Sequence, residues 1–96
     1  MKFEWDDAKD RSNKKKHGVS FAEVQRLFES GEDYLEIFDE DHAEAEDRFI
    51  AVGQIDRGIV VVVYTEREEK HIRIIGARFA SKREEELFHS HMDIYR

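Results

Sequence analysis

The chain is 96 residues long, which fits one small domain with a modest core. It has no cysteine, which excludes disulfide bonds and thiolate metal sites. Its 23 acidic residues outnumber its 16 Lys and Arg residues, which gives a formal net charge of −7. No apolar run is long enough to span a bilayer, and the start turns acidic where a signal peptide would be basic. We therefore expect a single domain over residues 1–96, located in the cytoplasm and without a membrane partner.

The N-terminal part of the chain predicts a short strand followed by a helix. Residues 2–5 alternate between polar and apolar side chains, as a half-buried strand does. Asp6 is a favourable N-cap, lysines crowd the last turn, and Gly18 suits the left-handed position after a helix end. The sequence therefore predicts a helix over residues 7–16.

A second helix is predicted directly after the first. Ser20 and Glu23 have the spacing of a capping box, in which side chains and backbone satisfy each other at a helix start. The helix would carry an apolar stripe made of Phe21, Val24, Leu27 and Phe28. This stripe predicts packing on the core, and the helix is expected to end near residues 30–31.

Four strands and a last helix complete the predicted order. The strand candidates are joined by short links typical of antiparallel hairpins and comprise residues 34–38, 48–55, 59–66 and 71–78. The run Ile59–Tyr64 is apolar at both parities, which predicts a central strand covered on both faces. Ser81 and Glu84 form another capping box, which opens the last helix. The fold class is α+β: a short N-terminal strand, two helices, an antiparallel sheet of three to four further strands and a C-terminal helix.

Charge is divided unevenly along the sequence. The segment Glu29–Asp47 holds ten acidic residues and no Lys or Arg, which leaves 13 acidic residues against 16 Lys and Arg elsewhere, a formal charge of +3. Opposed patches of this kind can each attract a different partner. A solvated acidic loop on an ordinary acidic protein explains the same pattern.

The predicted first helix has almost no apolar face, since Ala8 is its one apolar residue. Lys9, Asn13 and Lys16 lie on one face at helical spacing, with His17 beside them. These groups suit contacts to phosphates. The alternative is a solvated helix whose cations are placed to complement its dipole.

A second basic cluster lies toward the C-terminus. Its members are Arg67, Lys70, Arg73, Arg78, Lys82 and Arg83. Arginine makes forked contacts to phosphate, so arginines on a sheet can position a phosphate that is to be cut. The alternative is that each pairs with a neighbouring acid such as Glu66 or Glu68, with little effect on stability.

These residue types suit RNA cleavage without a metal ion. In that reaction the ribose 2′-hydroxyl attacks the adjacent phosphate, and the protein supplies a base, an acid and stabilisation of charge. The candidates for proton transfer are His17, His71 and Glu66. The candidates for charge stabilisation are Arg48, Arg73 and Arg78, and Tyr64 is a candidate for stacking on a base.

Two further clusters are weighed as metal sites. The acidic stretch with Asp39, Asp41, His42, Glu44 and Glu46 lacks the glycine and the spacing of a calcium loop. His89 and His91 would not share a helix face. We therefore predict no metal site and no cofactor.

Several blocks of the sequence, over about residues 3 to 85, resemble the BrnT toxin family. They are Phe3-Glu4-Trp5-Asp6, Lys9, Asn13, Lys16-His17-Gly18-Val19-Ser20-Phe21, Asp41-His42, Arg48-Phe49-Ile50 with Val52-Gly53, Val63-Tyr64-Thr65-Glu66-Arg67, and Arg73-Ile74-Ile75-Gly76-Ala77-Arg78 with Ala80 and Arg83-Glu84. The resemblance implies a RelE-like ribonuclease fold and the toxin half of a type II toxin–antitoxin pair. It implies a BrnA-like antitoxin partner whose ribbon-helix-helix part binds DNA, so that DNA is contacted only through the antitoxin.

The first hypothesis is therefore a metal-independent endoribonuclease that inhibits translation and growth. Its predicted catalytic residues are His17, Arg48, Glu66, Arg73 and Arg78, and its predicted RNA-binding residues are Lys9, Asn13, Lys16, Tyr64, Arg67 and Arg83. The alternative is a catalytically weak binding module that acts mainly through complex formation with its antitoxin. A stand-alone DNA-binding protein is disfavoured, because no helix-turn-helix pattern is visible.

Overall fold

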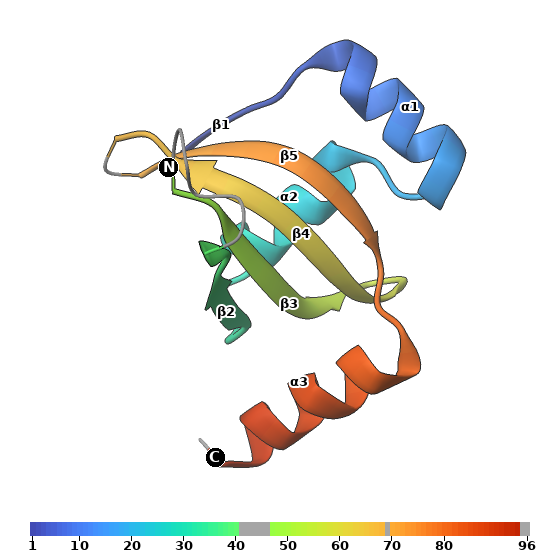
Figure 1. The fold of residues 1–96 in the computed structure, drawn as a ribbon, viewed down its shortest axis with the longest axis vertical. Helices are drawn as coiled ribbons and strands as arrows, with labels where there is room; N and C mark the ends of the chain where they lie inside the picture. The colour runs from blue at the N-terminus through green and yellow to red at the C-terminus, as the bar shows by residue number, and fades with distance from the viewer. Residues whose placement is uncertain (41–46, 69, 95–96) are drawn as a thin grey trace.

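The computed structural model describes residues 1–40, 47–68 and 70–94. Its elements, in chain order, are β1 (Lys2–Glu4), α1 (Asp7–His17), α2 (Phe21–Glu29), β2 (Leu35–Phe38), β3 (Phe49–Ile55), β4 (Gly58–Glu66), β5 (His71–Phe79) and α3 (Lys82–Ile94) (Figure 1). The predicted α+β class and the predicted order of elements are confirmed.

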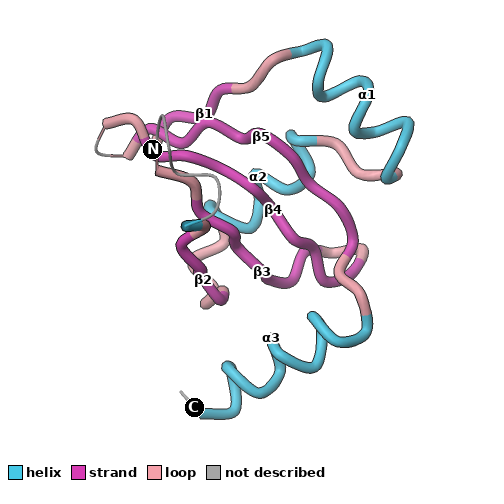
Figure 2. The backbone as a smooth tube through the Cα atoms, viewed as in Figure 1, coloured by secondary structure: helices cyan, strands magenta, loops and turns pink. Residues whose placement is uncertain are grey.

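All five strands form one sheet in the order β1-β5-β4-β3-β2 (Figure 2). The pairs from β2 to β5 are antiparallel, as expected. The sheet is nevertheless mixed, because β1 joins the outer edge of β5 in parallel, with Phe3 beside Ile72 and Glu4 beside Arg73. A three-residue strand carries no pattern that reveals its neighbour, so the sequence predicted the strand and not its place.

One face of the sheet, here called the α2 face, carries most of the core. The apolar stripe of α2 packs there on alternate residues of β4, including Val60, Val62 and Tyr64. Gly53 of β3 lets α2 approach closely, since a Cβ at this position would overlap the Leu27 side chain. The predicted amphipathic character of the second helix is thereby confirmed.

The opposite face, here called the α3 face, is covered only in part. Phe88 of α3 packs with Val52, Ile59 and Val61, and Met92 adds to the same cluster. Figure 1 shows α3 following the end of β5 and running back past β3 and β2, while α2 runs behind β4 and β5. Because Val60 and Val61 are both buried, β4 is covered on both faces, as its apolar run predicted.

A β-bulge between β4 and β5 changes which residues of β5 share a face. Tyr64 pairs with Ile74, whereas Val63 pairs with Gly76, so Ile75 is the extra residue. Simple alternation would direct Arg73 and Arg78, five positions apart, to opposite faces. The bulge shifts the alternation by one, and both arginines lie on the α3 face.

Polar side chains, not apolar ones, hold α1 against the sheet. None of its residues is buried. Asn13 donates from Nδ2 to the carbonyl of Val19 at 3.0 Å and accepts at Oδ1 from the Ala77 N–H at 3.2 Å, while Asp10 Oδ1 accepts from the Phe21 N–H at 2.8 Å. Since β1 covers only the first residues of β5, the Ala77 N–H belongs to an otherwise open edge, and Asn13 satisfies it.

The link between α1 and α2 is tied to the turn between β3 and β4 by Arg57. Its guanidinium pairs with Glu23 at 2.6 Å and donates to the carbonyl of Gly18 at 2.6 Å, and it lies 5.2 Å from the ring centroid of Phe79. This pairing lowers the pKa of the Glu23 carboxyl. Gly18 itself has the left-handed conformation predicted for it, with φ of 76°.

The start of α3 has the predicted capping box. Glu84 accepts from the Ser81 N–H at 2.8 Å, and the Glu84 N–H donates to Ser81 Oγ at 3.2 Å. Arg78 adds two parallel hydrogen bonds to the same carboxylate, at 2.7 and 2.8 Å. The Arg78 hydrogen bonds, with those from Ser81, lower the pKa of the Glu84 carboxyl to about 2.

Replacing Asn13 with Ala should destabilise the protein by about 1–3 kcal/mol, because the Ala77 N–H and the Val19 carbonyl lose their partner. Urea unfolding of the purified protein measures this loss. Lys15→Ala, on an exposed position of the same helix, is the matched control and should cost much less. Equal losses for the two variants would show that Asn13 does not anchor the helix.

Replacing Arg78 with Gln should raise the pKa of the Glu84 carboxyl from about 2 toward its ordinary value of 4.5. A carboxyl with a lowered pKa stabilises the fold above its unfolded pKa, and this contribution disappears as the pH falls from 4.5 to about 2. An NMR titration of the Glu84 side-chain carbon measures both midpoints. The same midpoint in the two proteins would contradict the assigned cause.

Candidate functional site

Predicted site residues meet on the α3 face at the end formed by β1 and β5. Glu4 Oε1 lies 3.7 Å from Arg67 Nε and 3.4 Å from His71 Nε2, and Glu4 Oε2 lies 3.5 Å from an Arg73 amino nitrogen. Parallel pairing of β1 with β5 places Glu4 beside Arg73. Glu4, Arg67, His71 and Arg73 are called the Glu4 cluster below.

Arg48 extends this cluster across the sheet. It directly precedes Phe49, which pairs with Tyr64, so Arg48 lies beside Thr65, the partner of Arg73. Among the described residues, two buried polar atoms lack a hydrogen bond: Arg48 Nε and Glu4 Oε1. A buried polar group without a partner costs about 1–3 kcal/mol, and such groups concentrate where a protein binds or reacts.

A second group of predicted residues lines a cavity further along the same face. This cavity has a volume of about 280 Å³, and Asn13, His17 and Arg78 contribute to its walls. Arg78 is hydrogen-bonded to Glu84, and this pairing raises the pKa of the Arg78 guanidinium. Asn13 accepts a hydrogen bond from the edge of the sheet. The bulge in β5 is what directs both Arg73 and Arg78 to this face.

Tyr64 corrects one prediction. Its side chain is 0% exposed, with Phe28 and Phe49 packed on it at centroid distances of 4.9 and 5.6 Å. Its hydroxyl donates to Glu36, and burial raises the pKa of the phenol. The proposed base contact is therefore wrong, because even-numbered residues of β4 face α2 and leave no ring surface free.

Glu66 lies on the wrong side of the sheet for the predicted site. It follows Tyr64 by two residues and pairs with Ile72, a core residue of the α2 face. The carboxylate among the arginines is instead that of Glu4, which is absent from the predicted set. The alternation over residues 2–5 distinguishes Glu4 from its apolar neighbours but does not say which strand it meets.

The remaining predicted residues lie at the surface. Lys9, Lys16 and Arg83 are exposed, outside both the Glu4 cluster and the cavity lining. Their predicted contacts with RNA stay predictions. The metal candidates Asp41, His42, Glu44 and Glu46 fall outside the described residues.

Over residues 1–40, 47–68 and 70–94, no group of His, Asp and Glu is arranged to hold a metal ion. In the same residues, no helix has the length and apolar character needed to cross a membrane.

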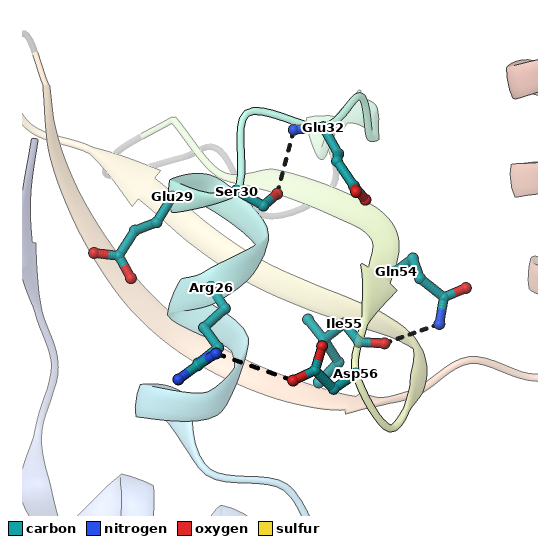
Figure 3. Close-up of a pocket in the computed structure, with 7 residues that line it drawn as sticks. All are labelled: Arg26, Glu29, Ser30, Glu32, Gln54, Ile55 and Asp56. Atoms are coloured by element: carbon teal, nitrogen blue, oxygen red, sulfur yellow. Dashed lines mark hydrogen bonds and ion pairs between the residues drawn. The ribbon is translucent and has the colours of Figure 1, made fainter.

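A further cavity lies between the end of α2 and the turn after β3 (Figure 3). It has a volume of about 590 Å³ and contains none of the predicted site residues. Many of its polar groups are paired with one another: Arg26 lies 4.0 Å from Asp56, and the Gln54 amide donates to the Ile55 carbonyl at 2.8 Å. The arrangement is that of an open surface hollow.

Comparison with known proteins agrees with the fold and with the sequence blocks. The family model described as "Ribonuclease toxin, BrnT, of type II toxin-antitoxin system" matches residues 5–84. The structure is similar to the 1.1 Å crystal structure of the Brucella abortus ribonuclease toxin BrnT, with a TM-score of 0.64 and 26% sequence identity, over 85% of this chain and 99% of that chain. No curated protein sequence matches the chain. The chain belongs to the BrnT family of ribonuclease toxins of type II toxin–antitoxin systems.

Proposed function

We propose that the chain is an endoribonuclease that cuts RNA at the Glu4 cluster without using a metal ion. The observation that carries this proposal is the carboxylate of Glu4, held among Arg67, His71 and Arg73 with one oxygen buried and lacking a hydrogen bond. A carboxylate, an imidazole and two guanidinium groups supply proton transfer and charge stabilisation in one place. Phosphodiester cleavage by the 2′-hydroxyl requires both.

In the proposed reaction the ribose 2′-oxygen bonds to the adjacent phosphorus, and the bond from phosphorus to the 5′-oxygen breaks. The products are a 2′,3′-cyclic phosphate and a free 5′-hydroxyl. His71 takes the 2′-hydroxyl proton at Nδ1, while Glu4, 3.4 Å from Nε2, stabilises the imidazolium that forms. The leaving 5′-oxygen takes its proton from solvent.

Arginines surround the proposed position of the phosphate. Arg67 and Arg73 are placed to stabilise the charge that develops on its oxygens, by the forked contacts that guanidinium groups make. Arg48 has a buried Nε without a partner and lies across Thr65 from Arg73. Arg78 and His17 lie further along the same face, so we assign them to holding the neighbouring part of the RNA.

The family suggests the setting in which this activity operates. We propose that RNA cleavage by the chain inhibits translation and growth, and that a BrnA-like antitoxin neutralises it. A ribbon-helix-helix part of that antitoxin would bind DNA, so the toxin reaches DNA only through its partner. Membership of a type II toxin–antitoxin family supports this setting.

A second candidate function is a binding module with weak catalysis. It is favoured by the pairing of Arg67 and Arg73 with Glu4 and of Arg78 with Glu84, since each arginine already faces a carboxylate of the same chain. The exposed acids of residues 29–36 would then attract a basic partner.

Replacing Arg73 with Ala should lower the rate of RNA cleavage on the order of 10² or more, because a charge that stabilises the transition state is lost. The assay uses purified protein and a labelled RNA, with and without EDTA, and identifies the cyclic phosphate. Arg26→Ala, an exposed arginine on α2, is the control and should cut at the native rate. Native protein that leaves RNA intact would contradict the proposed function.

Replacing Glu29, Glu32 and Asp33 with their amides should slow association with the antitoxin at low salt, because electrostatic steering is reduced. Stopped-flow measurement at low and high salt separates this effect from a change in the contact surface. Glu85→Gln and Glu86→Gln on α3 form the control. An association rate that is independent of salt in the native protein would exclude steering by the acidic segment.

A further inference from the structure

The cavity on the α3 face adjoins the Glu4 cluster in regular register. Along β4, Thr65 pairs with Arg73 of the cluster, and Val63, two residues earlier, pairs with Gly76 of the cavity lining. Two residues along a strand span about 7 Å. The floor of the cavity therefore begins roughly one nucleotide step of an extended single strand away from the proposed phosphate position.

The floor of this cavity is apolar and open. Ile50, Val61 and Val63 supply the apolar surface, and Gly76 supplies no side chain. A Cβ at Gly76 would meet nothing within 4 Å, so the space above it is empty. Its volume of about 280 Å³ is close to the lower limit of about 300 Å³ for small-molecule sites, which suits one nucleobase better than a whole nucleotide.

All but one of the polar side chains that line the cavity are hydrogen-bonded to other groups of the protein. Asn13 is bonded to the Val19 carbonyl and the Ala77 N–H, and Arg78 is bonded to Glu84. His17 is half-buried and lines the cavity, and its side chain has no hydrogen bond or ion pair within the described part of the chain. Its imidazole is free to donate or accept at the edge of a base.

We infer that this cavity binds a single nucleobase of the RNA strand, next to the phosphate that is cut. The base packs on the apolar floor above Gly76, and His17 hydrogen-bonds to its edge. This inference rests on the proposed function for the position of the phosphate, and it assigns the adjoining site to a flat aromatic ligand. Stacking of a base on a protein surface typically changes affinity by about five- to 150-fold.

Filling the cavity tests the inference. Gly76→Val adds a side chain into empty space at a position with no left-handed backbone requirement, so the fold should be retained, as a thermal melt would show. The probe is a set of short RNAs with one 2′-deoxy residue at the cleavage site and an abasic residue scanned along the strand. Binding is measured by fluorescence anisotropy. Ala22→Val, at an exposed position of α2, is the matched control.

Native protein and Ala22→Val should lose about tenfold in affinity when the abasic residue lies beside the cleavage site, and little at distant positions. Gly76→Val should bind the intact RNA about tenfold more weakly and show no further loss with that abasic residue. His17→Ala should reduce the preference among the four bases at this position. Should Gly76→Val fail to fold, Gly76→Ala with His17→Ala replaces it in the same comparison.

The inference is overturned if folded Gly76→Val binds every RNA as tightly as native protein does. It is also overturned if the abasic residue lowers the RNA affinity of Gly76→Val and of native protein by the same factor. In that result, slow cleavage by Arg73→Ala would still support the proposed function. Conversely, native protein could leave RNA intact and still bind more weakly when one position of the strand is abasic. If Gly76→Val abolishes this loss of affinity, the result would support the base-binding site and contradict the proposed ribonuclease activity. Absence of any RNA binding would overturn both.

Discussion

The side-chain amide of Asn13 holds the first helix in place through one hydrogen bond that it donates and one that it accepts. The short β1 strand leaves most of the outer edge of β5 open, and Asn13 satisfies the Ala77 N–H on that edge while also fixing the loop carbonyl of Val19. Asp10 adds a hydrogen bond from the Phe21 N–H, and the helix has no apolar face to add to these polar contacts. Because His17 follows Asn13 by one turn, the same anchor places its imidazole over the cavity on the α3 face.

Local patterns in the sequence were sufficient for the elements and their order. The capping residues Asp6, Ser20 and Ser81 mark helix starts through short-range hydrogen bonds, and the structure shows each of those bonds. The doubly apolar run of β4 likewise predicted a central strand. These features depend on neighbours a few residues away in the sequence, so they can be predicted from the sequence alone.

The site was only partly predictable, because its geometry depends on contacts between distant strands. The alternation of β5 would separate Arg73 from Arg78, and only the bulge at Ile75 brings them to one face. Glu66 was predicted to be a catalytic carboxylate. It lies an even number of residues from Tyr64, so the alternation of β4 directs its side chain to the α2 face. Glu4 replaces it through a parallel pairing that no local pattern reveals.

The parallel pairing of β1 with β5 also has a consequence for how the protein is made. The ribosome synthesises Glu4 long before His71 and Arg73, because these two residues lie far downstream of Glu4 in the sequence. Closing so long a loop is slow compared with forming the local helices and hairpins. The Glu4 cluster is therefore assembled late, and a nascent or truncated chain that lacks β5 has no such cluster. The RNA cleavage proposed for this cluster therefore requires that β5 has been synthesised and has paired with β1.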